Sequence, residues 1–379
     1  AAVPGRYVIY LHNQATIACW PLFAWGMGEH LKTSDVFVSA SRYDARTLKL
    51  TFPRAKVVLH PFWLPGKVEE VRKKRNRATT FVYAGRISSQ KNLHTLLCSF
   101  ALYRTMNESD PKDRLVIYGG EDGLGSPNMG FKDEGYGRRL VEIARRLGIE
   151  GSVEFAGSLD RSDLHRKLKD PHVFVSASLH SDENFGMSAL RSLAMGAPAV
   201  LTRWGGHADF AAEFGRRLGF VKVEGSKRGP WVDPRQFAGA MGKASEKPMT
   251  SSRVPRRYRL ESMASLIRKM VSGPRPAVST PLLRTPFANS ILDGRTDMKI
   301  FSSYEDPRAH RLLASYGMRK SKRVVPHQAK FEVMPWVTLG RSKVEVFDPH
   351  RGTWKFKVDR SVEAELVECG WAQASAVKS

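Results

Sequence analysis

The sequence contains little cysteine and no long apolar run. Its 379 residues include three cysteines, Cys19, Cys98 and Cys369, which are far apart and have no His or Cys beside them at metal-ligand spacing. This pattern argues against a disulfide framework and a zinc site, and a reducing cytoplasm is the simplest location. No stretch approaches the ~20 consecutive apolar residues of a membrane span, and residues 1–6 lack a signal-peptide pattern. We therefore expect a soluble, cytoplasmic protein.

Acidic residues are also scarce. There are 37 of them against 61 lysines and arginines, which gives a formal net charge of +24. Such a charge attracts polyanions, namely nucleic acid, acidic lipid headgroups or phosphorylated substrates. The densest basic stretches, 72–77, 256–259 and 319–323, are not interleaved with aromatic residues as a single-strand stacking platform would require, and they accompany no DNA-binding motif, so nucleic acid is the least favoured partner. Peripheral contact with an anionic membrane stays open.

Short apolar stretches alternate with helical patterns over most of the chain, which has 42% hydrophobic residues. In the first part we expect strands at 6–11, 36–39 and 56–59 and a helix at 41–50. A longer alternating series follows, with strands at 79–83, 115–118, 152–155, 173–178 and 199–202, and helices at 93–103, 136–147, 161–168, 187–195, 234–243 and 260–271.

This alternation predicts an α/β fold with parallel, doubly wound sheets. We expect a partial Rossmann-like unit at 1–65, a complete Rossmann-like unit at 66–273, and a linker with a small α+β appendage at 274–379. In the appendage, strands are expected at 343–347 and 353–358, a weaker one at 333–339, and a helix at 360–369.

The loop Glu183-Asn184-Phe185-Gly186 is the most informative segment. It follows a buried strand and opens the helix at 187–195. Gly186 lets the backbone approach a ligand, and the first helical N–H groups, at Met187 and Ser188, suit an anion. Glu183 accepts hydrogen bonds from hydroxyls but repels phosphate, so the loop suits a ligand with a phosphate end and a polyol end, such as a nucleotide-sugar. A solvated loop charge beside a helix-start glycine is the alternative.

A second loop has complementary chemistry. Gly85 and Arg86 follow the strand at 79–84, and Lys91 comes five residues later at the start of the next helix. An arginine can bind a diphosphate bidentately and a lysine as a point charge, although basic loops are often only solvated. Because ligands of parallel sheets sit beyond the carboxyl ends of the strands, we expect both loops to lie at one edge.

Together these segments resemble the donor-binding half of a retaining GT-B glycosyltransferase of the glycosyl transferases group 1 family. The resemblance runs from about residue 7 to residue 271, and its specificity comes from the order of the whole set. The residues that carry it are Gly85-Arg86, Lys91-Asn92, Ile117-Tyr118-Gly119-Gly120, Val153-Glu154-Phe155-Ala156-Gly157, Glu183-Asn184-Phe185-Gly186 and Gly196-Ala197-Pro198.

The resemblance implies a role for each matching residue. Arg86 and Lys91 would hold the donor diphosphate, assisted by Gly85 and by backbone N–H groups from Phe185 to Ser188. Glu183 would take the sugar hydroxyls, and the loop after Gly157 would border the base. His12 matches a histidine that lies near the transferred sugar in this family. The family also implies retention of anomeric configuration and no metal or other cofactor, the diphosphate being stabilised by the cations and the helix terminus.

Two departures from the family pattern stand out. The family has a second glutamate eight residues after the first, which binds ribose hydroxyls, and this sequence has Arg191 there. Arginine has no acceptor, so it would meet a phosphate instead, or the site has degenerated. In addition, the first residue is not Met and the β/α units that precede the His12 strand in the family are missing, so we expect an N-terminally truncated chain.

Two functions from different classes follow. The leading expectation is transfer of a sugar from a nucleotide-sugar to a carbohydrate or lipid-linked acceptor, with Glu183 and His12 at the reacting sugar. The alternative is a catalytically inert nucleotide-sugar-binding or scaffold protein, which Arg191 and the missing N-terminal units favour.

Overall fold

The fold is described from a computed structural model. It covers residues 8–11, 30–66, 78–106, 109–121, 135–179, 183, 185–226, 229–250, 254–273 and 279–282, together with 319–320, 338–339, 343–348 and 352–357. His12, Asn184, the basic stretch at 72–77 and the helix expected at 360–369 lie outside these residues.

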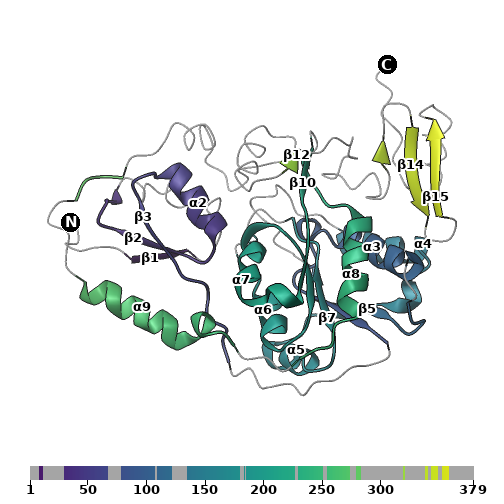
Figure 1. Ribbon diagram of the computed structural model, residues 1–379, viewed down its shortest axis with the longest axis horizontal. Helices are drawn as coiled ribbons and strands as arrows, with labels where there is room; N and C mark the ends of the chain where they lie inside the picture. The colour runs from purple at the N-terminus through teal and green to yellow at the C-terminus, as the bar shows by residue number, and fades with distance from the viewer. Residues whose placement is uncertain are drawn as a thin grey trace.

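The first sheet has three parallel strands in the order β1 (Val8–Leu11), β2 (Val36–Ser39) and β3 (Lys56–Leu59). Phe37 points to one face, where it packs with Leu48 and Phe52 of the α2 segment (helix Arg42–Thr51). Val36 and Val38 point to the other face. There they pack against Met270 of α9 (Leu260–Ser272), so a helix lies on each face of the sheet (Figure 1).

The second sheet has six parallel strands in the order β6-β5-β4-β7-β8-β9. Their bounds are β4 Thr80–Ala84, β5 Arg114–Tyr118, β6 Val153–Gly157, β7 Val173–Ser176, β8 Ala199–Thr202 and β9 Leu218–Val221. Strand order grows outward from β4 to β6 and then restarts on the other side of β4 with β7. The sheet therefore has a topological switch point between β4 and β7, the place where such sheets bind their ligands.

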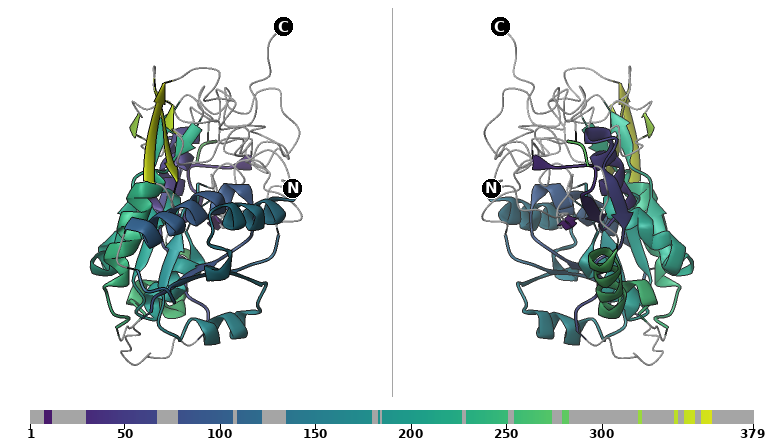
Figure 2. Two further views of the ribbon diagram at one scale, coloured as in Figure 1. Left: turned by 90° about the vertical axis from the view of Figure 1, so that its right-hand side faces the viewer. Right: turned by 90° about the vertical axis from the view of Figure 1, so that its left-hand side faces the viewer.

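Helices cover both faces of this sheet, as Figures 1 and 2 show. One face packs against α3 (Leu93–Met106), α4 (Tyr136–Arg146) and α8 (Pro234–Ser245). The other packs against α5 (Arg161–Lys167), α6 (Met187–Ala194) and α7 (Ala211–Phe214). Alternate residues of β4 separate the two cores, because Phe81 and Tyr83 belong to the first and Val82 and Ala84 to the second.

Short-range signals in the sequence explain several helix starts. Ser41 caps α2 by accepting a hydrogen bond from the Asp44 N–H, and Asp160 caps α5 by accepting one from the Asp163 N–H. Asp233 does the same for α8, whose first residue is Pro234. Side chains of this type satisfy helix N–H groups that have no intrahelical partner, and proline suits the first helical position.

The remaining elements are short. They are the 3-10 helices η2 (Ser89–Lys91), η3 (Glu150–Ser152), η4 (Gly205–Phe210), η5 (Gly215–Arg217) and η6 (Arg256–Tyr258), and strands β10 (Glu224–Ser226), β11 (Gly229–Trp231), β12 (Arg319–Lys320), β13 (Thr338–Leu339), β14 (Lys343–Asp348) and β15 (Gly352–Lys357). Strands β13, β14 and β15 form an antiparallel sheet. Strands β14 and β15 lie within one residue of the predicted bounds, and β13 covers the last two residues of the weaker prediction at 333–339.

Candidate functional site

The two loops singled out from the sequence meet at the switch point of the six-stranded sheet. The first follows β4 and the second follows β7, and these strands are hydrogen-bonded neighbours. The contact between the loops is an ion pair, with 2.6 Å between Lys91 Nζ and Glu183 Oε2. Both side chains are largely buried, with 15% and 10% of their surface exposed. The expectation that both loops lie at one edge is therefore met by direct contact.

A serine completes the environment of the Glu183 carboxylate. Ser178, buried two residues beyond the end of β7, donates its hydroxyl to the same Oε2 atom at 2.5 Å. Two donors on one oxygen fix the carboxylate in place. The negative charge of Glu183 also acts on Tyr83. Burial and this charge hold the pKa of Tyr83 well above its usual range.

The loop after β4 is held from both sides. The backbone N–H of Gly85 donates to Tyr118 O at 2.9 Å, and the Tyr83 hydroxyl donates to Arg86 O at 2.9 Å. These bonds fix the backbone, while the Arg86 residue itself is exposed at the sheet edge. The positive charge of Arg86 works against the rise in the pKa of Tyr83, so the guanidinium belongs to the same electrostatic environment as Glu183.

Asn92 connects the two loops through the backbone. Its side-chain amide donates to Ala177 O at 3.1 Å and its oxygen accepts from Thr95 Oγ1 at 2.6 Å. The residue has a φ of 56°, a left-handed conformation that asparagine tolerates better than most residues. Asn92 thereby fixes the position from which Lys91 reaches Glu183.

The second loop leads directly into α6. Gly186 is the N-cap residue of α6 and has a φ of 84°. Because glycine has no side chain, no side-chain hydrogen bond caps the first turn. The N–H groups of Met187 and Ser188 lie in that turn, and both residues are partly exposed. A helix terminus of this kind favours an anion. The Phe185 side chain points into the core, against Phe62 and Phe210 at ring-centroid distances of 5.3 and 5.4 Å.

A third loop, residues 205–207 after β8, also holds Glu183, and the sequence did not predict this contact. The N–H of Gly206 donates to Glu183 O at 2.7 Å. Gly205 has a φ of 52°, and a Cβ there would lie 2.0 Å from Glu183 O. His207 is buried with its Nε2 3.8 Å from Glu183 Oε1. The available signal was the glycine pair Gly205-Gly206, which comes two residues after the end of β8.

Arg191 lies on α6 and is buried, with 8% of its surface exposed. Its guanidinium donates to Pro65 O at 3.1 Å and lies 3.3 Å from His165 Nδ1. Burial and the nearby charge of Arg161 lower its pKa. Arg191 is thus hydrogen-bonded to the segment that joins the two sheets. A role in donor binding stays a prediction.

Gly157 ends β6 at the same carboxyl edge as the loops above. It has a φ of 74°, and its carbonyl accepts from the Gly119 N–H at 2.8 Å. His12 and Asn184 fall outside the described residues, so their predicted roles have no geometry to compare. Within the described part of the chain, no group of three or more His, Cys, Asp or Glu side chains is arranged to hold a metal ion.

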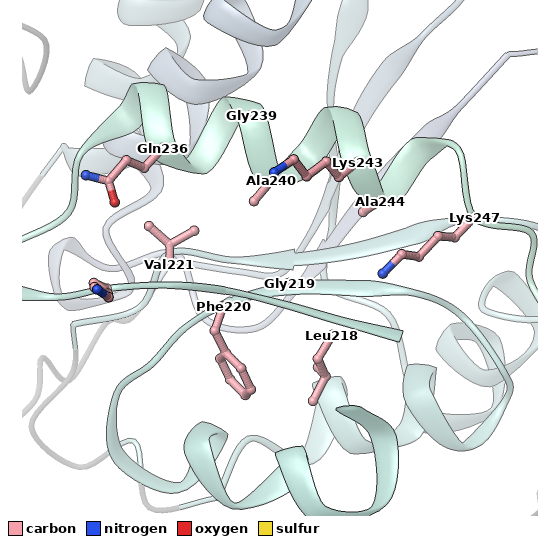
Figure 3. Close-up of a pocket in the computed structure, with 11 residues that line it drawn as sticks. Leu218, Gly219, Phe220, Val221, Gln236, Gly239, Ala240, Lys243, Ala244 and Lys247 are labelled. Atoms are coloured by element: carbon pink, nitrogen blue, oxygen red, sulfur yellow. The ribbon is translucent and has the colours of Figure 1, made fainter. Parts of the chain in front are cut away.

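A cavity of about 540 Å³ lies elsewhere, between edge strand β9 and helix α8 (Figure 3). Leu218, Gly219 and Phe220 line it from the strand and Lys243 and Lys247 from the helix side. None of the residues predicted for the site lines this cavity. The hollow on this side of the sheet is therefore separate from the Glu183 loop.

Comparison with known proteins agrees with this geometry. Residues 67–228 match the family model of glycosyl transferases group 1. The matched segment lies within the complete Rossmann-like unit that the sequence predicts at 66–273. In fold, it resembles sucrose-phosphate synthase from Thermosynechococcus elongatus, with a TM-score of 0.50 at 17% identity over 70% of this chain and 68% of that one. The fold is of the GT-B type, which confirms the predicted class.

Curated relatives match only part of their length. Mannosylfructose-phosphate synthase of Agrobacterium fabrum is 30% identical over 150 residues, 37% of this chain and 31% of the relative. A D-inositol 3-phosphate glycosyltransferase of Corynebacterium jeikeium is 28% identical over 172 residues, 44% of this chain and 35% of the relative. The alpha-monoglucosyldiacylglycerol synthase of Streptococcus pneumoniae is 33% identical over 121 residues, which is 32% of this chain and 23% of the relative. The chain thus spans about a third or less of the length of these relatives.

Proposed function

We propose that this chain is a glycosyltransferase that transfers a hexose from a nucleotide-sugar to a carbohydrate or lipid-linked acceptor, with retention of configuration and without a metal. The observation that carries the proposal is the contact of Lys91 and Ser178 with one oxygen of Glu183, at the switch point and beside the N-terminus of α6. The names of the relatives include both an inositol phosphate glycosyltransferase and a glucosyldiacylglycerol synthase, which supports either kind of acceptor.

The geometry suggests how a donor would be held. A carboxylate beside a diphosphate is unfavourable unless a cation lies between them, and Lys91 is already placed against Glu183. The lysine ammonium has three donors, so it can keep Glu183 and also meet a phosphate oxygen. Arg86 and the first N–H groups of α6 would then share the negative charge that develops on the departing diphosphate. Glu183 would accept the sugar hydroxyls, with His12 near the transferred sugar as the family resemblance implies.

Isothermal titration calorimetry against UDP-, GDP- and ADP-sugars tests the donor site. We expect one of the three nucleotides to bind with the sugar attached. A folded sample that binds none of them would remove the donor-site assignment, and circular dichroism of the same sample establishes that it is folded.

The Arg86→Ala variant tests the diphosphate contact. Loss of a charge-assisted hydrogen bond should weaken donor binding by about tenfold to a hundredfold. The matched control is Arg114→Ala, which removes an exposed arginine at the start of β5, at the opposite edge of the same sheet. Equal affinities for the Arg86 variant and the unaltered protein would exclude Arg86 from the site.

A second candidate function is an inert binding or scaffold protein. It is favoured by Arg191, which stands where the family resemblance expects a ribose-binding glutamate and is engaged with Pro65 O. Hydrolysis or transfer of the donor by the purified chain, measured as release of nucleoside diphosphate, would exclude this alternative.

A further inference from the structure

The loop formed by Gly205, Gly206 and His207 holds the Glu183 loop at both of its ends. At the first end, the Gly206 N–H donates to Glu183 O at 2.7 Å. At the other end, the imidazole of His207 fills the space beside Gly186, where a Cβ would lie 2.6 Å from the His207 Cδ2 atom. A side chain at position 186 and a ring at position 207 exclude each other. The two residues therefore form one packing unit.

The ring also faces the functional group of that loop. His207 is 2% exposed, and its Nε2 lies 3.8 Å from Glu183 Oε1, the carboxylate oxygen opposite the one that Lys91 and Ser178 contact. The distance is longer than a hydrogen bond, so the ring orients the carboxylate by the dipole of its N–H group and by packing. On its far side, the ring lies against Phe210, with 6.3 Å between centroids and 30° between planes. Phe210 in turn packs on Phe185.

The electrostatic surroundings favour a neutral ring. Burial lowers the pKa of His207 below its ordinary value, with the positive charge of Lys91 acting in the same direction and Glu183 acting against it. The backbone of Thr202 also acts against this lowering of the pKa, and the buried Nδ1 has no hydrogen-bond partner within the described residues. A neutral imidazole carries its proton on one nitrogen only, and a lone pair on Nε2 would be repelled by the carboxylate. The proton is therefore expected on Nε2.

We propose that His207 is a positioning residue for Glu183: its buried Nε2–H side keeps the carboxylate turned toward Lys91 and toward the sugar of the donor. The proposal deepens the proposed function and rests on it for the identity of the ligand that Glu183 meets. It predicts that His207 affects binding of the sugar part of the donor, whereas Arg86 affects binding of the diphosphate part.

The first experiment measures this division by calorimetry. The titrants are UDP-glucose, GDP-mannose and ADP-glucose, each compared with its nucleoside diphosphate. His207→Leu should weaken binding of the nucleotide-sugar about tenfold and change binding of the diphosphate less than about threefold. His207→Gln, whose amide nitrogen reaches the Nε2 position, should restore most of the affinity. His207→Asn, whose amide reaches only the Nδ1 position, should not.

The matched control is His172→Leu. His172 is also a buried histidine, but it lies at the start of β7, at the opposite end of the sheet, with its Nδ1 2.8 Å from Asp170 O. It should leave the ratio of nucleotide-sugar to diphosphate affinity unchanged. Equal weakening of both ligands by His207→Leu, or equal affinities for the Gln and Asn variants, would overturn the proposal. If the Leu variant does not fold, the Gln and Asn pair carries the test.

The second experiment needs no ligand. Nitrogen-15 NMR of histidine-labelled protein reports which ring nitrogen carries the proton, and the spectrum of the His207→Gln variant identifies the His207 signals. We expect a neutral ring protonated on Nε2 near pH 7. A proton on Nδ1 would place the lone pair toward Glu183 and overturn the proposal. If no nucleotide-sugar binds the unaltered protein, the proposed function fails, while this measurement still decides the orientation of His207.

Discussion

Glu183 places a carboxylate beside a helix N-terminus that also suits phosphate. Lys91 lowers the repulsion that the carboxylate would exert on a phosphate there. Its ammonium lies 2.6 Å from the carboxylate and partly neutralises it. With side chains only 15% and 10% exposed, water screens this pair less than a surface pair. The same contact therefore supports the stability of the loop as well as the proposed binding of a diphosphate.

The Lys91→Met variant tests the structural part of this contact. It removes the Lys91 ammonium from a largely buried carboxylate, which should lower the free energy of unfolding by about 2 kcal/mol. Adding Glu183→Gln to the same chain also removes the negative charge, so the double variant should lose less. Urea unfolding monitored by circular dichroism measures both. A double variant less stable than Lys91→Met would contradict the role of the pair.

Buried histidines make stability depend on pH. Burial lowers the pKa of His172 from 6.5 to about 4 and that of His94 to about 3. Below pH 6.5 the unfolded chain binds protons that the folded chain does not, so stability is lost as the pH falls from 6.5 toward 4.

The His172→Asn variant removes one of these groups. Its stability should fall less steeply over that window, by about 1.4 kcal/mol per pH unit. Urea unfolding at a series of pH values measures the slope. Parallel slopes for the variant and the unaltered protein would show that His172 is protonated in the folded state or does not titrate differently on unfolding.

At the scale of elements, η4 connects the two sheets as well as clamping the site. His207 near its start faces Glu183, and Asp209 near its end faces α2. The Asp209 carboxylate accepts the backbone N–H of Arg42 at 2.7 Å, beside the Ser41 cap of the same helix. A residue of the six-stranded unit thus completes the N-terminus of a helix that covers the first sheet.

The Asp209→Ala variant should free this N–H. Loss of a capping contact costs about 1 kcal/mol, so hydrogen exchange of the Arg42 amide should accelerate about fivefold. Asp160→Ala is the matched control, because Asp160 caps α5 within the six-stranded unit and should affect the Asp163 amide instead. An unchanged rate at Arg42 would show that Asp209 does not hold α2 in solution.

Elements with strong local signals were predictable, and an element supported by its neighbours was not. The strands at 36–39, 56–59 and 199–202 are found within the predicted bounds, because short runs of β-branched and apolar residues indicate strands. Strand β9 was missed. It contains Gly219 and has no alternation, and it exists because β8 offers an edge on which Leu218 and Val221 can be buried. Pairing partners of this kind cannot be read from one segment alone.

At the scale of the whole molecule, the chain crosses between its two sheets more than once. Helix α9 follows the six-stranded unit in sequence but packs on the first sheet, where Met270 contacts the Val36 and Val38 face. Residues 279–282 also return there, and Leu282 joins the core beneath α2. The segment before the six-stranded sheet is tied back as well, by the Leu64 N–H bond to Tyr258 O at 2.8 Å.

The net charge of +24 supports one prediction at this scale. None of the helices in the described part of the chain has the length and apolar character of a membrane span. We propose that the chain associates with anionic membranes through its positive charge, which attracts acidic lipid headgroups. Co-sedimentation with phosphatidylserine vesicles should fall as sodium chloride rises from about 0.05 M to about 0.5 M, because salt shortens the range of attraction. Phosphatidylcholine vesicles are the control. Absence of salt-sensitive binding would exclude the association.

The sequence by itself determined the class of the fold and two of the three loops of the site. Alternating apolar and helical segments are local properties, and Glu183, Lys91 and Gly186 have side chains or backbones whose chemistry is visible without neighbours. Only the tertiary structure decided which residues surround them. The Lys91 and Ser178 contacts, the His207 ring beside Gly186 and the engagement of Arg191 with Pro65 all depend on strand order. The physical reason is that β4, β7 and β8 become neighbours only when the sheet forms, and the sequence of each strand alone does not indicate which strands pair.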